Sequence, residues 1–113
     1  MTTVTLGLSS VDQAKRKLAA AFKGQAQGTH LTFSSVDLLW KVLTPKRWAI
    51  LQVLTGQGPL SIREVARRLQ RDVKSVHADV KALVTAGLID QTPVGIEFPY
   101  SAIHVDFTLS KAA

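Results

Sequence analysis

The hydrophobic pattern is clearest over residues 61–88, where it predicts two short helices joined by a polar turn. The first helix begins at Ser61, because Ser61 and Glu64 form an S-x-x-E capping box. We expect the serine hydroxyl and the glutamate carboxylate to satisfy free N–H groups of the first turn. The apolar side chains recur at the spacing of one helix face, namely Ile62, Val65, Ala66 and Leu69.

The second helix is predicted to begin after Asp72, a favoured N-cap residue, and to end at Gly87 in a left-handed cap. Gln70 and Arg71 form the turn between the two helices. Two helices joined by so short a turn predict a helix-turn-helix, whose second helix can enter a DNA major groove. The expected buried face of the second helix consists of four positions: Val73, Val76, Val80 and Leu83.

Upstream of residue 61 the pattern predicts a short strand over residues 30–34 and two further helices. Ser34 with Asp37 is expected to cap the first of these helices. Pro45, after Thr44, is expected to open the second, because proline is tolerated at a first helical position. The second helix, residues 45–55, would be the first of a three-helix core. Two tryptophans are interpreted as anchors of that core, Trp40 and Trp48.

The N-terminal part has a weaker pattern. Residues 2–8 alternate weakly and are predicted to be a frayed tail or a short edge strand. Ser10 and Gln13 make another capping box, which opens a basic amphipathic helix to about Lys23. The GQAQG run at residues 24–28 is typical of a flexible linker. The expected organisation is therefore an N-terminal basic helix and linker, 1–28, and a second domain, 29–113.

After Gly87 the apolar period changes from 3.6 to 2, which indicates strands. Residues 88–92 and 96–98 flank a Pro-Val-Gly turn, and residues 103–109 show the cleanest alternation in the chain. Helices followed by a hairpin are the plan of a winged helix. The predicted fold class is α+β, mostly α: a winged helix-turn-helix with a three-helix core, a C-terminal β-hairpin and an N-terminal helical extension.

The outward face of the second helix carries the candidate chemistry. We predict that Lys74, Ser75 and His77 contact base edges in the major groove of double-stranded DNA. Basic side chains near the turn and further along the helix are predicted to neutralise phosphates. On this hypothesis Arg71→Ala weakens binding to all sequences, whereas Lys74→Ala relaxes specificity. A solvated polar face on a helical packing unit is the alternative. The predicted phosphate contacts are Arg67, Arg68, Arg71 and Lys81.

The charge of the chain supports an anionic partner. The formal net charge is +6 and the isoelectric point is about 10.1. Residues 59–87 carry six Lys or Arg against three acids, while residues 88–113 carry one Lys against three acids. The basic helices thus precede an acidic C-terminal part, whose acids are Asp90, Glu97 and Asp106.

Several classes of protein are disfavoured by what the sequence lacks. There is no cysteine, no secretory signal pattern and no apolar run of membrane-spanning length, so we expect a cytoplasmic protein without membrane contact. The histidines His30, His77 and His104 have no metal-ligand spacing, and neither a G-x-S-x-G nor a phosphate-binding loop occurs. We therefore expect no enzyme activity, no metal and no cofactor.

The segment from LSIREVARRL to AGLI, followed by the hairpin, resembles winged helix-turn-helix bacterial regulators of the MarR/ArsR-like kind. More narrowly, LTFSS (31–35), LWKVLTPKRW (39–48), DVKSVHADV (72–80) and FPYSAIHVDF (98–107) resemble a family of small DNA-binding antitoxins paired with TumE-type toxins. The resemblance implies a transcriptional regulator that binds its own promoter as a homodimer and holds a cognate toxin inactive.

The acidic hairpin departs from that pattern, because the wings of such regulators usually carry Arg or Lys. As a hypothesis, the hairpin is instead a surface for dimerisation or for a basic toxin, with Glu97 and Asp106 as its charges. Two other readings of the chain stay open. One is a protein-interaction module that neutralises a partner, and the other is an RNA-binding winged helix without specific DNA readout.

Overall fold

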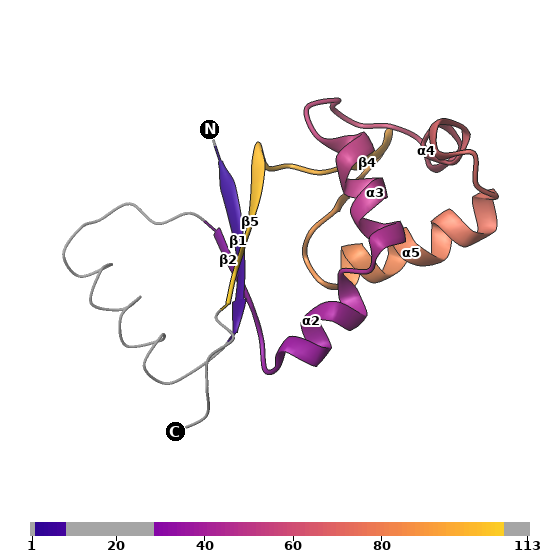
Figure 1. Ribbon diagram of the computed structural model, residues 1–113. Helices are drawn as coiled ribbons and strands as arrows, with labels where there is room; N and C mark the ends of the chain where they lie inside the picture. The colour runs from indigo at the N-terminus through magenta and orange to yellow at the C-terminus, as the bar shows by residue number, and fades with distance from the viewer. Residues whose placement is uncertain (1, 9–28, 108–113) are drawn as a thin grey trace, which may run out of the picture.

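The computed structural model describes residues 2–8 and 29–107, and these form a small α+β arrangement (Figure 1). A three-stranded sheet lies on one side and a group of helices lies on the other, with a two-stranded hairpin beside the helices (Figure 1). The elements follow one another as β1 (Thr3–Leu8), β2 (Thr29–Phe33), α2 (Val36–Val42), α3 (Pro45–Leu54), α4 (Ile62–Leu69), α5 (Val73–Thr85), β3 (Asp90–Thr92), β4 (Gly95–Glu97) and β5 (Ala102–Asp106).

Strand β1 is the middle strand of the sheet, whose order is β2-β1-β5 with both neighbours parallel to β1. Val4 and Leu6 are completely buried, while Thr5 lies between His30 and His104 in the register. The prediction of a frayed tail or edge strand for residues 2–8 is therefore wrong. The hydrophobic pattern of residues 2–8 was weak because only two of their apolar side chains enter the core. The strands that pair with these residues are distant in sequence.

Strand β5 (Ala102–Asp106) confirms the strand predicted from the alternation at residues 103–109, as far as the described residues reach. It pairs in parallel with β1, so that Ile103 lies opposite Val4 and Val105 opposite Leu6. The side chains of β5 alternate between half-buried and exposed, as an amphipathic strand requires. The N-terminal and C-terminal parts of the chain thus complete one sheet.

The predicted hairpin is present as β3 and β4, which pair antiparallel with Gln91 opposite Ile96. Leu60, just before α4, extends this pairing through two backbone hydrogen bonds with Ile96, of 2.9 and 2.8 Å. Gly95 makes this contact possible, because a Cβ atom there would overlap the Leu60 carbonyl group. The hairpin is therefore attached to the segment that leads into α4.

The N-cap residues of the helices follow the predicted capping chemistry with one exception. Thr44, Ser61 and Asp72 accept backbone N–H groups of their first turns at 3.3, 3.1 and 2.8 Å. The cap of α2 is Ser35, which accepts from the Leu38 N–H, and not the predicted Ser34. At the other end of α5, Gly87 has a φ of +88°, which is the left-handed conformation expected there.

The buried core draws on every helix, on β1 and on the segment from residue 88 to residue 98. Ile50, Leu54 and Leu83 are among its largest fully buried side chains. Two predicted core residues are placed differently. Trp40 is 50% exposed and Val73 is 45% exposed. Trp40 is therefore no core anchor, whereas Trp48 is half-buried and packs against the core as predicted.

The predicted basic helix at residues 10–23 and the linker at residues 24–28 lie outside the described residues. Residues 3–8, which precede them, are hydrogen-bonded into the same sheet as residues 29–33 and 102–106. Among the described residues, no helix has the length and apolar character needed to cross a membrane.

Candidate nucleic-acid interface

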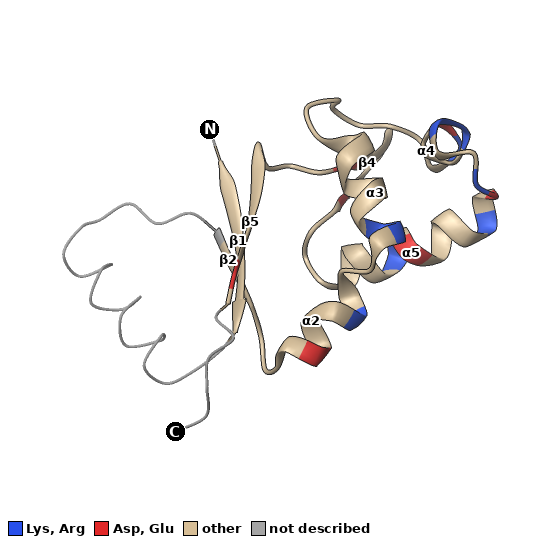
Figure 2. Cartoon of the chain, in the orientation of Figure 1, with Lys and Arg blue, Asp and Glu red and all other residues tan. Residues whose placement is uncertain are grey.

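The solvent face of α5 carries three of the predicted contact residues. Lys74, His77 and Lys81 are all exposed, while Val76 and Val80 on the opposite face are buried. The period of the helix explains this arrangement, because positions 74, 77 and 81 are spaced by three and four residues. Figure 2 colours lysine and arginine positions blue on α4, on the turn after it and along α5. The prediction that this face of α5 is exposed to solvent is confirmed.

Arg67 and Arg68 lie near the end of α4, where both reach back to Glu64. Arg67 makes two hydrogen bonds with the Glu64 carboxylate, and Arg68 makes one of 3.0 Å. Hydrogen bonds from Arg67, and then from Arg68, hold the pKa of Glu64 at about 2. The Glu64 side chain was expected to cap the helix, but these arginines bind it instead. Arg67 still exposes 71% of its side chain.

Arg71 has a different environment from Arg67 and Arg68. Its side chain is only 17% exposed, and its Nη2 donates to Asp79 and to the Ser75 hydroxyl, both at 2.7 Å. Arg71 therefore joins the turn before α5 to the first and second turns of that helix. Ser75, a predicted base contact, is half-buried and takes part in this bonding.

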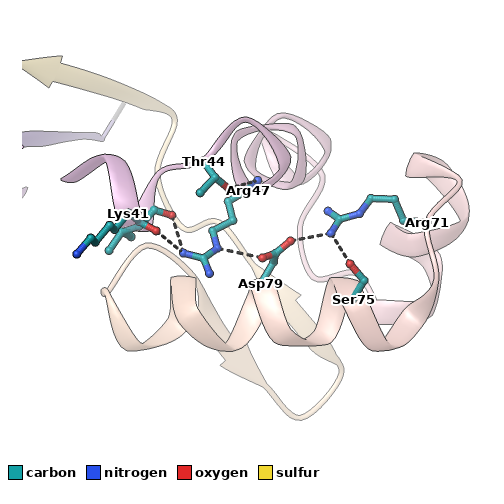
Figure 3. Close-up of polar contacts among 7 residues, drawn as sticks. Lys41, Thr44, Arg47, Arg71, Ser75 and Asp79 are labelled. Atoms are coloured by element: carbon teal, nitrogen blue, oxygen red, sulfur yellow. Dashed lines mark hydrogen bonds and ion pairs between the residues drawn. The ribbon is translucent and has the colours of Figure 1, made fainter. Parts of the chain in front are cut away.

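Asp79 also receives a second arginine, Arg47 of α3, whose Nε lies 3.0 Å from Oδ1 (Figure 3). The Nη1 of Arg47 donates to the carbonyl oxygens of Lys41 and Val42 at the end of α2. Partial burial raises the pKa of Asp79, but the hydrogen bonds from Arg71 and Arg47 outweigh it and lower the pKa below its usual value. One carboxylate thus connects α2, α3, the turn and α5.

No local spacing links Arg47 to Asp79, because the two residues are 32 positions apart in the sequence. The spacing of Asp79 from Val76, Val80 and Leu83 places it at the edge of the buried face of α5. That position is a signal for a partner on a neighbouring helix, although it does not say which residue the partner is.

A hollow of about 620 Å³ lies between α5 and the hairpin. It is lined on one side by His77 and Val73 of α5 and on the other by Gln91 and Thr92 of β3. Arg63 of α4 also lines it and is exposed, yet the sequence analysis did not select this residue. The position of Arg63 opposite the apolar face of α4 was the available signal.

The acidic side chains of the C-terminal part do not all lie on the hairpin. Asp90 and Glu97 lie opposite each other on the hairpin, whereas Asp106 lies on β5 in the other sheet. Side chains alternate between the faces of a strand. Gln91 faces the hollow and Ile96 is buried, so Asp90 and Glu97 lie on the face turned away from His77. Asp106 is therefore not part of the hairpin, to which we expected it to contribute a charge.

The structure thus brings Lys74, His77 and Lys81 together on α5, with Arg67 and Arg68 on the neighbouring helix. It separates Arg71 from this group by pairing it with Asp79. Within the described ranges, no three His, Cys, Asp or Glu side chains gather in a way that could hold a metal ion.

A family model matches residues 42–105, which is more than half of the chain and includes α3, α4, α5 and all three C-terminal strands. Its description is HVO_A0114. The chain belongs to the HVO_A0114 family. No curated protein and no solved structure matched the chain. The HVO_A0114 match covers the whole of the basic surface described above, and its name states no activity.

Proposed function

We propose that this HVO_A0114 family member is a winged helix-turn-helix protein that binds double-stranded DNA and regulates transcription. In this proposal α4 and α5 form the helix-turn-helix, α3 completes the three-helix core and β3–β4 are the wing. The backbone pairing of Leu60 with Ile96 supports this reading, because it attaches the hairpin beside the two helices.

The observation that carries the proposal is the exposed basic face of α5. Lys74, His77 and Lys81 occupy it, and the only acid of the helix, Asp79, is partly buried and paired with Arg47 of α3. Lysine side chains on one helix face, beside exposed arginines of the neighbouring helix, are the electrostatic signature of a nucleic-acid reader. The acids of the hairpin lie on its far face, so they do not oppose a nucleic acid that enters the hollow beside His77.

The roles of the residues follow from their exposure. Lys74 and His77 are placed to contact base edges, and Ser75 can donate its hydroxyl proton while it accepts from Arg71. Arg67, Arg68 and Lys81 are placed to contact phosphates. Arg71 stabilises the turn before α5 through its ion pair with Asp79. Only the small exposed part of its side chain is left to contact a phosphate.

In this mechanism a homodimer places two copies of α5 in successive major grooves, roughly 34 Å apart on a pseudo-palindromic site. Fluorescence anisotropy across a salt series tests the proposal, with duplex from upstream of the protein's own gene compared with random duplex. We expect tighter binding to the upstream duplex and a steep fall of affinity with salt. Equal and weak binding to both duplexes would refute a sequence-specific regulator.

A pair of lysine variants makes the test specific for α5. Lys74→Ala is expected to reduce the preference for the upstream duplex by about tenfold, because one base contact is lost. Lys46→Ala, an exposed lysine on α3, is the matched control and should leave this preference unchanged. If both variants lose the preference equally, α5 does not read the sequence.

Autoregulation and the neutralisation of a toxin remain predictions from the sequence resemblance.

RNA is the second candidate ligand, because a basic face does not distinguish the two nucleic acids. Single-stranded RNA readers usually present several aromatic side chains for stacking, and the exposed face of α5 carries only the imidazole ring of His77. A competition between duplex DNA and RNA in the same anisotropy assay decides between them.

A further inference from the structure

Helix α2 presents an unusual set of side chains to solvent. Leu38 and Trp40 are 43% and 50% exposed, and they belong to a helix of seven residues. Asp37 and Lys41 are exposed on the same side, and Figure 2 shows the acid at the beginning of α2 and the base at its end. Neither charge forms an ion pair with another described residue. Exposed apolar side chains that border polar ones are typical of an interaction surface.

An apolar groove of about 480 Å³ runs beside this helix. Trp40 forms one wall of the groove and Trp48 of α3 forms another. The Trp40 ring is held in place by an edge-to-face contact with Phe107, with ring centroids 5.5 Å apart. The groove therefore has a rigid aromatic rim. Its remaining lining residues are Leu43, Thr44, Pro45 and Val105.

We propose that α2 and this groove form the docking surface for a second copy of the chain. The two copies of α2 lie antiparallel across a two-fold axis that passes beside Leu39, the middle residue of the helix. This arrangement sets Asp37 of each protomer opposite Lys41 of the other. The surface is thus complementary in charge to itself, as a closed two-fold interface requires.

The apolar side chains fit the same axis. Trp40 is one residue past the middle of α2, so the two Trp40 rings lie side by side on the flank where the groove opens. Each ring can then enter the groove of the other protomer. Leu38 is one residue before the middle and meets its own copy on the opposite flank. Burial of these side chains supplies the attraction between protomers.

The charges decide the orientation. Exposed ion pairs add little affinity in water, but like charges placed opposite one another are repulsive and exclude the wrong arrangement. A parallel arrangement of the two helices would set Asp37 against Asp37 and Lys41 against Lys41. The antiparallel arrangement instead places Asp37 of each protomer opposite Lys41 of the other.

This inference names the contact surface for the dimer in the proposed function, but it does not depend on DNA binding. The charged face of α5 is on a different helix, and no residue of α5 lines the groove beside α2. Its test is made without DNA, so failure of the dimer and failure of DNA recognition are distinguished.

The experiment measures the mass of the full chain by sedimentation equilibrium over a range of concentrations. The wild type is expected to be a dimer at micromolar concentration. Asp37→Lys makes α2 entirely basic and Lys41→Asp makes it entirely acidic. Each variant alone should raise the dimer dissociation constant at least about tenfold, because two pairs of like charge then face each other.

Two rescues separate an interface from a folding defect. An equal mixture of the two single variants should give dimers, since an acidic α2 then meets a basic one. The double variant D37K/K41D should also dimerise, because the charges are exchanged but still complementary. Asp90→Lys on the hairpin is the matched control for charge reversal and should leave the mass unchanged.

The proposal is overturned if the wild type is monomeric throughout, or if the single variants dimerise as well as the wild type. It is also overturned if neither the mixture nor the double variant restores the dimer while circular dichroism shows that all are folded.

Discussion

Arg71 and Asp79 are joined by an ion pair of 2.7 Å across the start of α5, and fewer than one fifth of either side chain is exposed. Asp79 uses its other oxygen to bind Arg47 of α3 at 3.0 Å. Helix α5, which carries the candidate contact residues, is therefore held to its neighbours by the Asp79 carboxylate, which binds the guanidinium groups of Arg47 and Arg71. This pairing gives Arg71 a structural role in addition to the phosphate contact predicted from the sequence.

The first prediction concerns the stability that this carboxylate provides. Asp79→Asn keeps the shape of the side chain but leaves Arg47 and Arg71 without a counter-charge in a partly buried site. We expect the free energy of unfolding to fall by about 2 kcal/mol. Urea denaturation measures it, and Asp90→Asn, an exposed acid, should change it by less than about 0.5 kcal/mol. Equal losses in both variants would contradict the role of Asp79.

The second prediction is the pH dependence of stability. The pKa of Asp79 is lowered in the folded chain, so the unfolded chain binds more protons at acidic pH. The contribution of Asp79 is therefore present above the unfolded pKa of about 3.9 and is lost as the pH falls through the lower folded value. The thermal unfolding temperature, measured from pH 6 downward, should decline less steeply for Asp79→Asn than for the wild type. Parallel curves would show that Asp79 does not contribute.

The third prediction separates Arg67 from Arg71 in DNA binding. Arg67 is largely exposed, so Arg67→Ala should weaken binding to all duplexes and lower the slope of log affinity against log salt by about one. Arg71→Ala should lower the free energy of unfolding as well, because it also removes the partner of Asp79. Anisotropy across a salt series and urea denaturation of the same two proteins provide the comparison. A loss of stability in Arg67→Ala would be the contrary result.

The fourth prediction concerns the acids of the hairpin. Asp90 and Glu97 lie on the face turned away from His77, so Glu97→Lys should change DNA affinity by less than about threefold in physiological salt. Lys74→Ala, on the proposed contact face, serves as the comparison and should cost about tenfold on a specific site. A large gain in affinity for Glu97→Lys would place the far face of the hairpin close to DNA.

The fifth prediction tests the attachment of the hairpin. Gly95 has a φ of +152°, and a Cβ atom there would overlap the Leu60 carbonyl. Gly95→Ala should therefore lower the free energy of unfolding by about 3 kcal/mol. Gly58→Ala is the control, since Gly58 has a φ of +70° with no atom near its Cβ position, and it should cost about 1 kcal/mol. Similar losses would mean that the contact with Leu60 is unimportant.

Local chemistry was enough to predict the helices and the hairpin. Ser61, Asp72 and Gly87 act within one helical turn of their own position, so their capping roles can be recognised without knowing the rest of the fold. The same holds for the exposed direction of Lys74, His77 and Lys81, which follows from the period of α5. For the candidate surface, the sequence therefore determined which helix face is basic.

The tertiary structure decided everything that depends on pairs of residues distant in sequence. It placed β1 between β2 and β5, set Arg47 against Asp79 and directed the acids of the hairpin away from α5. It also left Trp40 half-exposed, although a tryptophan by itself suggests a core residue. Backbone pairing and ion pairing of this kind depend on which segments meet after the chain has folded, and no local pattern in the sequence encodes that choice.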